Sequence, residues 1–290
     1  MEKYKVMEQV NNYLLLMRLN KPIGIYLLLW PMLWAFFIAS NGQPNFFIMF
    51  LFIVGVVLTR SAGCVINDFF DKEIDSKVER TKERVLANGK VSTSEALILF
   101  FGLIALCILL LLMIGFDILI YAIISFCLLV IYPLSKRVIK IPQLILGIAF
   151  GSSIPMVYIA EIGEVTASCM LLYLATISWA IAYDTYYAIA DKIDDLKIGN
   201  KSSAILFGTK DISYPFNLQV LTITLLFIVG IINNLELFFY ISLLIALMLS
   251  VYQKILAAKR IPYQCISAFE NNNYFGLIIF FGLLLSYIYE

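Results

Sequence analysis

Nine long apolar runs follow one another along the chain, and they constrain its fold more than any other feature. They lie roughly at 23–39, 45–65, 96–116, 118–135, 142–160, 167–190, 212–232, 237–253 and 273–289. Each has about the 17–25 residues that a helix needs to cross a hydrocarbon core of about 30 Å. Because backbone groups in lipid must satisfy their own hydrogen bonds, such runs form helices. The sequence therefore predicts an all-α, polytopic membrane protein with nine transmembrane helices in a single domain, 1–290.

The composition supports this interpretation and excludes several kinds of chemistry. The chain is 62% hydrophobic and 14% charged, whereas soluble domains are about half apolar and about a quarter charged. It has no histidine. This excludes histidine-based acid–base catalysis, Ser-His triads and histidine-ligated zinc sites.

The basic residues indicate the orientation in the membrane. All 21 Lys and Arg residues lie in or beside one set of connections, if Arg60 is assigned to that side at the end of the second run. This set comprises the N-terminal segment and the loops near 66–95, 134–141, 191–211 and 254–266. Cytoplasmic loops carry the excess of Lys and Arg, so we expect these connections and the N-terminus in the cytoplasm.

A short internal similarity links two of these cytoplasmic connections. Asp71-Lys72-x-x-Asp75 follows the second run, and Asp191-Lys192-x-x-Asp195 follows the sixth, 120 residues later. Membrane proteins often build a site between internal repeats. We interpret the pair as a pseudo-repeat with acidic motifs at 67–75 and 184–195, although five residues can also agree by chance.

The first acidic motif has helical spacing. Asn67, Asp71 and Asp75 fall at i, i+4 and i+8, so a helix that continues past the membrane places them on one face, with Asp68 alongside. Carboxylates on one stripe repel one another unless a cation lies between them. Hard oxygen ligands of this kind suit Mg²⁺, which typically takes one or two carboxylates, several waters and phosphate oxygens. The alternative is a solvated acidic helix end.

The second acidic motif begins inside an apolar run. Asp184, Asp191 and Asp195 fall at i, i+7 and i+11 on one stripe, with Tyr187 and Asp194 nearby. An ionisable residue inside a membrane span is a candidate functional residue, and Asp184 meets that description. The alternative is a polar contact between helices.

Basic residues accompany both motifs. Arg60 precedes Asn67 by seven residues and so lies on the same stripe, nearer the membrane interior, where it could pair with a carboxylate or with a diphosphate. We interpret the remaining cations as positive-inside anchors, a few of which bind phosphate: Lys72, Arg80, Lys82, Arg84, Lys136, Arg137, Lys197 and Lys201.

Together the two clusters predict a metal-dependent site for a diphosphate with an apolar tail. Mg²⁺ held between them would bridge the diphosphate and help it leave as a Lewis acid. An allylic cation left behind needs a dry cavity with aromatic faces, which the 17 tyrosines, 22 phenylalanines and 3 tryptophans can supply.

The two acidic motifs resemble those of a known family. The segments 60–75 and 183–202 are similar to the first and second aspartate motifs of the UbiA superfamily of membrane prenyltransferases. More narrowly, both resemble the bacterial 4-hydroxybenzoate polyprenyltransferases of ubiquinone synthesis. The resemblance runs nearly end to end and also includes 18–24, 132–137, 151–155 and 271–277.

This resemblance implies a fold, a reaction and a set of site residues. It implies nine helices around a central cavity open towards lipid, in the bacterial inner membrane, with a cytoplasmic active site. It implies transfer of a polyprenyl group from its diphosphate to 4-hydroxybenzoate, giving 3-polyprenyl-4-hydroxybenzoate and diphosphate. The metal ligands would be Asn67, Asp71, Asp75, Asp191 and Asp195. The catalytic residues would be Asp68, Asp71, Asp75, Asp184, Asp191 and Asp195, and the substrate-binding residues Arg60, Asn67, Lys72, Tyr187 and Arg137.

Three further points follow from the same segments. Arg137 is the candidate for the carboxylate of the acid, because an arginine fork fits a carboxylate. The family's first-helix motif usually reads Arg-Leu-Asp-Lys-Pro, and Asn20 replaces its aspartate here, either as a helix cap or as a polar group that orients a cation or substrate. Loop 76–94 is a candidate lid over the substrate.

Two alternatives remain open at the level of the sequence. The acceptor could instead be homogentisate, a dihydroxynaphthoate, haem or a glycerol ether. The chain could also be an ion or metabolite transporter, since transporters place carboxylates inside a bundle and contain repeats. The gathering of the acidic clusters at one cytoplasmic mouth, beside basic groups, disfavours the transporter.

Overall fold

The computed structural model describes residues 2–77 and 81–289, and within that part its regular structure is entirely helical. The α-helices are α1 (Glu2–Leu16), α2 (Ile23–Ala39), α3 (Phe46–Asp75), α4 (Thr93–Ile114), α5 (Leu119–Val138), α6 (Pro142–Gly151), α7 (Ser153–Ile162), α8 (Ala167–Ile198), α9 (Ser203–Phe207), α10 (Ser213–Ile232), α11 (Leu237–Ala257) and α12 (Pro262–Ile288). Two 3₁₀ turns, η1 (Phe116–Ile118) and η2 (Gly208–Lys210), connect them.

Nine helical segments of the described chain correspond to the nine predicted runs. Eight are long and apolar enough to cross a membrane, α6 and α7 together forming one of them over Pro142–Ile162. The ninth is α2, which is apolar but has only 17 residues. At 1.5 Å per residue it is about 26 Å long, close to the thickness of the hydrocarbon core. The predicted all-α membrane fold is confirmed, with α2 as its shortest span.

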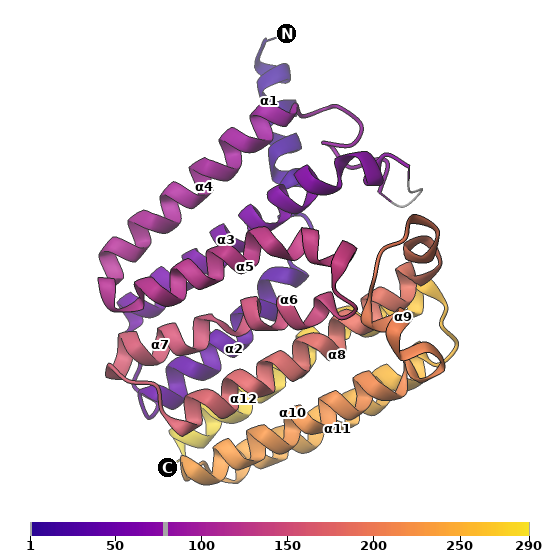
Figure 1. Cartoon of the computed structure of the whole chain (residues 1–290). Helices are drawn as coiled ribbons and strands as arrows, with labels where there is room; N and C mark the ends of the chain where they lie inside the picture. Colours follow the sequence, from indigo (N-terminus) through magenta and orange to yellow (C-terminus); the bar gives the residue numbers. More distant parts are fainter. Residues whose placement is uncertain (1, 78–80, 290) are drawn as a thin grey trace.

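The two helices that carry the acidic motifs are the longest in the bundle. α3 has 30 residues and α8 has 32, so both continue past their apolar stretches. Asn45 begins α3 by accepting hydrogen bonds from two backbone N–H groups, and Gly199 ends α8 in the left-handed conformation with φ 76°. Both helices run in the same direction and end on the same side of the bundle (Figure 1). The acidic residues at 191–195 therefore lie on a helix, as their i, i+7 and i+11 spacing predicted, and the connection that the sequence placed near 191–211 begins only after α8.

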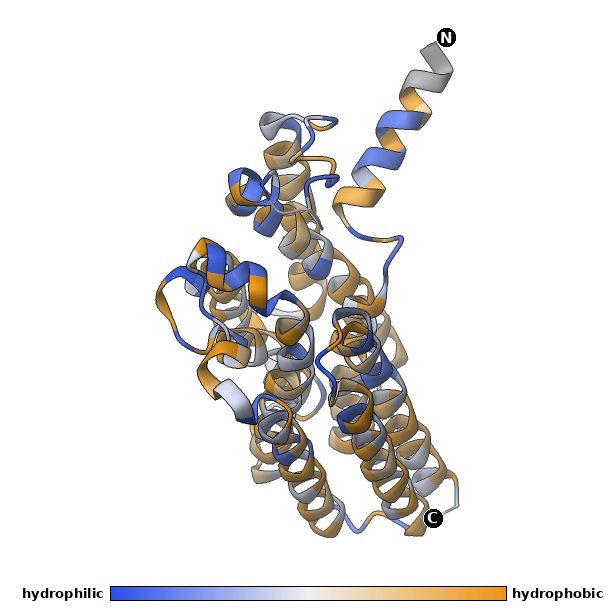
Figure 2. Cartoon of the chain, turned by 90° about the vertical axis from the view of Figure 1, so that its right-hand side faces the viewer, coloured by the Kyte–Doolittle hydropathy of each residue, from blue (hydrophilic) through white to orange (hydrophobic). Residues whose placement is uncertain are grey.

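The bundle has two sides with α8 near its middle. In Figure 1, α3, α4 and α5 lie on one side, α10, α11 and α12 on the other, and α2, α6 and α7 between them. Figure 2 shows the hydrophilic connecting segments gathered at the end opposite the C-terminus, whereas the helices below are mostly hydrophobic. The polar end is the one at which α3 and α8 terminate, so the two acidic motifs lie there.

One predicted span is bent in the middle. α6 ends at Gly151 and α7 begins at Ser153, although the apolar run is continuous in the sequence. Pro155 explains the break, because its ring lacks an N–H donor and clashes with the carbonyl of the residue four positions earlier. The bend places Ser152 and Ser153 on the wall of the central cavity.

Three consecutive asparagines of α12 connect the bundle's helices through buried and partly buried hydrogen bonds. Each side-chain oxygen accepts from a different partner, over distances of 2.9–3.0 Å. Asn271 accepts from Gln253 of α11, and Asn273 accepts from Trp30 of α2. The middle residue, Asn272, accepts from both Trp179 of α8 and Gln219 of α10. A Cβ on nearby Gly276 would lie 2.4 Å from Trp30 Cδ1, so only glycine lets the tryptophans approach. α12 thereby closes the bundle against its first span.

Candidate active site

A cavity of about 1140 Å³ extends from the polar end of the bundle deep between the helices. Its polar end is lined by acidic, basic and amide side chains of α3, α5 and α8. Its apolar length is lined by α3, α4, α5 and the η1 turn, including Leu51, Phe52, Ile108, Leu111, Phe126 and Ile118. A charged head group and a long hydrocarbon tail therefore both find suitable surroundings in one continuous space.

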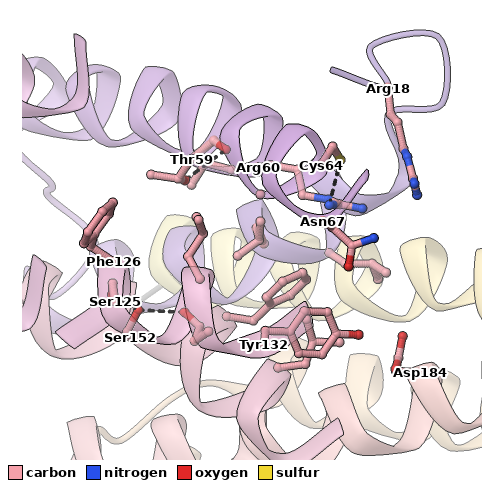
Figure 3. Close-up of a pocket in the computed structure, with 18 of the residues that line it drawn as sticks. Arg18, Thr59, Arg60, Cys64, Asn67, Ser125, Phe126, Tyr132, Ser152 and Asp184 are labelled. Atoms are coloured by element: carbon pink, nitrogen blue, oxygen red, sulfur yellow. Dashed lines mark hydrogen bonds between the residues drawn. The ribbon is translucent and has the colours of Figure 1, made fainter. Parts of the chain in front are cut away.

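The predicted stripe on α3 faces this cavity. Arg60, Asn67, Asp71 and Asp75 all line it, as their helical spacing predicted. Asn67 Nδ2 donates a 3.3 Å hydrogen bond to Asp71 Oδ2. Arg60 lies about two turns before Asn67, nearer the middle of the helix, where its guanidinium donates to Cys64 Sγ at 2.9 Å (Figure 3). The polar wall of α3 is thus a cation followed by an amide and two carboxylates.

The stripe on α8 lines the same cavity from the opposite wall. Asp184, Tyr187, Asp191 and Asp195 all contribute to it. In Figure 3, Asp184 faces the space that Asn67 enters from α3. Gln143, a buried side chain of α6 whose Oε1 atom accepts from the Ser203 N–H at 2.9 Å, also lines the cavity. The structure therefore brings together the two acidic motifs that the sequence separates by 120 residues.

Lys136 occupies the space between the two walls. Its Nζ atom lies 3.7 Å from Asp71 Oδ2, donates to Asn67 Oδ1 at 3.4 Å and lies 5.3 Å from the centre of the Tyr132 ring. The last turn of α5 carries it, and the sequence marked it only as one of several cations near phosphate. This ammonium, at 3.4–3.7 Å from the oxygens it contacts, is well placed to meet an incoming anion.

Aromatic rings cover the part of the cavity next to the acidic residues. Tyr132, Tyr183, Tyr187 and Phe269 all line it. Tyr187 and Phe269 meet edge to face with ring centroids 5.2 Å apart, and Tyr183 contacts the same phenylalanine at 6.0 Å. Ring faces of this kind attract a cation within about 6 Å. Phe269 comes from α12, and no sequence signal of the acidic motifs pointed to it.

Asp68 lies outside the cavity although it belongs to the first motif. Its side chain is buried and its Oδ1 atom accepts from Arg18 at 2.6 Å and from Arg84 at 3.1 Å. Burial alone would lower the pKa of Arg18, but the Asp68 carboxylate raises it above its ordinary value, so the guanidinium stays charged. The contacts of Asp68 are those of an anchor for two arginines, and its catalytic role stays a prediction.

Lys72 and Arg137 also lie outside the cavity. Lys72 donates to Thr93 Oγ1 at 3.0 Å, and Arg137 donates to the Phe70 carbonyl at 3.0 Å and lies 3.9 Å from Asp71. Both line a second, smaller hollow next to the first. Their part in substrate binding stays a prediction. The structure places both side chains at the second hollow and not in the main cavity.

Asn20 does not cap a helix and does not line the cavity. It is exposed, between α1 and α2. α2 begins after Pro22 with no side-chain cap, so Asn20 does not supply the hydrogen bond that one interpretation of this position required. Nothing in its surroundings explains the replacement of the family's aspartate.

The loop after α3 forms one wall of the cavity. Residues 78–80, and with them Arg80, lie outside the described part of the chain. Thr81 and Arg84 line the cavity, while Leu86 and Val91 are buried in a cluster with α3 and α4. Arg84 also donates to Asp75 Oδ2 at 2.6 Å. This part of the loop is therefore packed over the site, and its motion as a lid stays a prediction.

The donor atoms of the cavity fit a hard cation that shares its ligands with a substrate. Among the described residues, no three acidic or thiol side chains converge tightly enough to enclose a metal by themselves. Mg²⁺ does not require such a cage, since it usually keeps waters and phosphate oxygens beside one or two carboxylates. Asn67 and Asp71 on one wall and Asp191 and Asp195 on the other offer oxygen donors of this type.

A family model and a relative of known name both match nearly the whole of this chain. The model of the UbiA prenyltransferase family matches residues 28–284. A 4-hydroxybenzoate octaprenyltransferase from Pseudoalteromonas translucida (strain TAC 125) is 46% identical over 275 residues, which cover 95% of this chain and 94% of that relative.

Two solved structures of archaeal proteins have the same fold. The apo structure of a UbiA homolog from Aeropyrum pernix K1 matches with a TM-score of 0.79 and 22% identity, covering 90% of this chain and 97% of its own. A UbiA homolog from Archaeoglobus fulgidus, solved bound to GPP and Mg²⁺, matches with a TM-score of 0.72 and 16% identity, covering 94% and 99%. At these identities the similarity establishes the arrangement of helices.

Proposed function

The chain belongs to the UbiA prenyltransferase family, and from this premise we propose that it transfers a polyprenyl group from a polyprenyl diphosphate to 4-hydroxybenzoate. The products are 3-polyprenyl-4-hydroxybenzoate and diphosphate, as required in ubiquinone synthesis. The observation that carries the proposal is the continuous cavity, which joins two acidic walls and a lysine to a long apolar passage. The relative that is 46% identical over 275 residues is named for the same acceptor.

The polar end of the cavity binds the diphosphate. Lys136 and Arg60 supply positive charge to its oxygens, and both already face the space between the acidic walls. The tail then lies along α3, α4 and α5, where aliphatic and aromatic side chains replace lipid. Because lipid tails are as apolar as these side chains, the prenyl tail exchanges one apolar environment for another, and the diphosphate contacts must supply most of the affinity.

A magnesium ion would be held by Asn67, Asp71, Asp191 and Asp195, together with diphosphate oxygens. When bound, it neutralises the charge that develops on the leaving diphosphate. The A. fulgidus homolog solved with GPP and Mg²⁺ supports this assignment of the ion. Asp75 is paired with Arg84, so we assign it to the support of this wall and keep its metal contact as a further prediction.

The aromatic wall protects and orients the reacting centre. As the bond between the first prenyl carbon and the diphosphate oxygen breaks, its electron pair leaves with the diphosphate. The faces of Tyr183, Tyr187 and Phe269 stabilise the positive charge on the prenyl carbon and exclude water. The ring carbon of 4-hydroxybenzoate next to its hydroxyl forms the new carbon–carbon bond and then loses its proton. With no histidine in the chain, carboxylates such as Asp184 are the protein groups available to accept it.

The site faces the cytoplasm of a bacterial cell in this proposal. The chain is a multi-pass membrane protein, and the cavity opens at the end of the bundle where the basic connections gather. The positive-inside rule assigns that end to the cytoplasm. The inner membrane is the corresponding location, since both substrates meet at its cytoplasmic surface.

The test is prenyl transfer by the purified protein, with radiolabelled 4-hydroxybenzoate, a polyprenyl diphosphate and Mg²⁺. We expect labelled lipid from the wild type and a loss of about 10²–10³-fold in kcat for Asp71→Asn and Asp191→Asn, since each removes charge that holds the metal. Asp117→Asn is the matched control, because that carboxylate lies beside the opposite end of the bundle and does not line the cavity.

The other outcomes are equally informative. Product from homogentisate or a dihydroxynaphthoate but none from 4-hydroxybenzoate would refute the acceptor and keep the reaction. If a folded preparation transferred to no acceptor at all, the proposed reaction would be wrong, and flux of ions or metabolites in vesicles would be measured next.

A further inference from the structure

The last turn of α5 carries Lys136, and its own helix holds this turn by fewer hydrogen bonds than usual. Pro133 lies just before it and has no N–H group to donate to the preceding turn. The last carbonyl groups of a helix also lack partners within that helix. The position of the Lys136 ammonium therefore depends on the contacts that other elements supply to this end of α5.

Lys201, in the connection between α8 and α9, supplies two of these contacts. Its backbone N–H donates to the Lys136 carbonyl at 2.8 Å, and its Nζ atom donates to the Val138 carbonyl at 2.8 Å. Both acceptors belong to the last turn of α5. Lys201 thus caps α5 from a distant part of the sequence, and it brings a positive charge to the negative end of the helix dipole.

The chain on either side of Lys201 is fixed by hydrogen bonds. Before it, Asn200 donates from its backbone N–H to the Asp195 carbonyl at 3.0 Å and from Nδ2 to Asp195 Oδ1 at 3.4 Å. After it, the Ser203 N–H donates to Gln143 Oε1 at 2.9 Å in a buried place. The cap is therefore built on the end of the second acidic wall, and it joins that wall to the last turn of α5.

Lys201 and Lys136 both line the main cavity, but their ammonium groups have different surroundings. The Lys201 ammonium donates a short hydrogen bond to the Val138 carbonyl, and a diphosphate oxygen would have to replace that carbonyl to bind it. The Lys136 ammonium lies 3.4–3.7 Å from the Asn67 and Asp71 oxygens, so a diphosphate oxygen can approach it closely. Of the two lysines, Lys136 is the better placed to bind the diphosphate.

We propose that Lys201 is a positioning residue that acts on the diphosphate only through Lys136, by holding the last turn of α5 in place. The inference rests on the proposed function, in which the Lys136 ammonium binds the diphosphate. The sequence interpreted Lys201 as one of several cations near phosphate, whereas its contacts assign its charge to the end of α5. The second acidic wall and the diphosphate-binding lysine are thereby set at a fixed spacing.

The test is a double-mutant cycle between the two lysines, with the KM of the prenyl diphosphate as the measured quantity. Lys201→Met removes the bond to the Val138 carbonyl and keeps the backbone N–H. We expect it to raise this KM about fivefold, the effect of losing one charge-assisted hydrogen bond at an exposed residue, while kcat stays within twofold. In a Lys136→Gln background the same substitution changes the KM less than twofold, because the group that Lys201 positions is absent.

A binding measurement without turnover gives a second readout. Inorganic diphosphate with Mg²⁺ protects the Lys136 amine from acylation, which mass spectrometry locates, and the concentration for half-protection rises about fivefold in Lys201→Met. Lys201→Arg keeps a charged donor and returns both constants to within twofold of the wild type. Lys140→Met is the matched control, because Lys140 is exposed just after α5 and lines neither hollow of the polar end.

Several results would overturn the positioning role. A fivefold rise in KM in both backgrounds would make Lys201 a direct ligand of the diphosphate. An unchanged KM in Lys201→Met, a fall in kcat alone, or an effect of the same size from Lys140→Met would also contradict it. A wild-type protein that transfers to no acceptor is a different failure, since it refutes the proposed function before any variant is made.

Discussion

The Arg84 guanidinium donates a 2.6 Å hydrogen bond to Asp75 Oδ2, and the same group reaches Asp68 Oδ1 at 3.1 Å. One arginine of the loop after α3 thus holds two carboxylates of the first acidic motif. The motif therefore contains two kinds of acid. Asp71 lines the cavity beside Lys136, whereas Asp68 and Asp75 fasten the loop to the end of α3, Asp75 from a position that also lines the cavity.

Removing that arginine should loosen the loop. We expect Arg84→Gln to cost about 2 kcal/mol, less than the 3–5 kcal/mol typical of a fully buried broken pair, because the Arg84 side chain is 20% exposed. Limited proteolysis of the protein in detergent should cut within 81–92 about tenfold faster than in the wild type. Lys77→Gln, which removes an exposed cation at the start of the loop, is the control, and an unchanged cutting rate in Arg84→Gln would contradict the anchor.

Magnesium titration should separate the two kinds of acid. Asp71→Asn removes a carboxylate that lines the cavity and is a candidate metal ligand. We expect this variant to need an Mg²⁺ concentration about tenfold higher or more for half-maximal transfer, because it loses the contribution of one ligand to the metal affinity. Asp68→Asn should leave that concentration unchanged and lower the thermal midpoint, since it leaves Arg18 and Arg84 without their shared carboxylate. The same shift in Mg²⁺ requirement for both variants would show that Asp68 reaches the metal.

A single methyl group should displace Arg60 without disturbing the fold. A Cβ on Gly24 would lie 2.2 Å from Arg60 Nε, at the far end of a flexible side chain that can move aside. We expect Gly24→Ala to raise the KM of the prenyl diphosphate about fivefold, because the guanidinium no longer faces the diphosphate, while the thermal midpoint stays the same or rises. Gly102→Ala is the control, since nothing lies within 4 Å of its new methyl. An unchanged KM in Gly24→Ala would remove Arg60 from the diphosphate site.

The asparagine of α12 at the centre of the polar network should be a stability determinant. Asn272→Leu leaves the Trp179 Nε1–H without its acceptor in a fully buried place, and the Gln219 amide keeps only Gln253 Oε1 as an acceptor. We expect a loss of about 2 kcal/mol, measured by unfolding in mixed micelles of increasing sodium dodecyl sulfate content. Thr224→Val, which removes an exposed hydroxyl on α10, should change stability by less than about 0.5 kcal/mol. Equal stability of Asn272→Leu and wild type would mean that the network is compensated elsewhere.

Helical periodicity explains why much of the site could be predicted. Asn67, Asp71 and Asp75 share a face because a turn has 3.6 residues, and the same rule aligns Asp184 with Asp191. The apolar runs were readable for a related reason, since a membrane span must be long and apolar whatever it packs against. Both features are properties of one helix, so the sequence of that helix suffices.

The contacts between helices were not predictable in this way. Asp68 directly follows Asn67 but pairs with Arg18 and does not line the cavity. The sequence does not predict this contact, because it depends on where the segment between α1 and α2 packs against α3. Lys136 reaches Asp71 only because the last turn of α5 packs beside α3. The sequence analysis treated 142–160 as one helix because its apolar run is continuous. The break between α6 and α7 at Ser152 was therefore not predicted, although Pro155 is a residue type that interrupts helices.

The apolar passage along α4 has a consequence for how turnover is measured. α4 presents Leu111 and Ile108 to the cavity, while Phe101 and Leu109 lie exposed on its surface. At about 0.8 kcal/mol for every methylene group, a polyprenyl donor partitions almost completely into the bilayer. The concentration that governs binding is therefore the mole fraction of donor among the lipids, and adding lipid at constant donor dilutes the substrate as surely as adding water dilutes a soluble one.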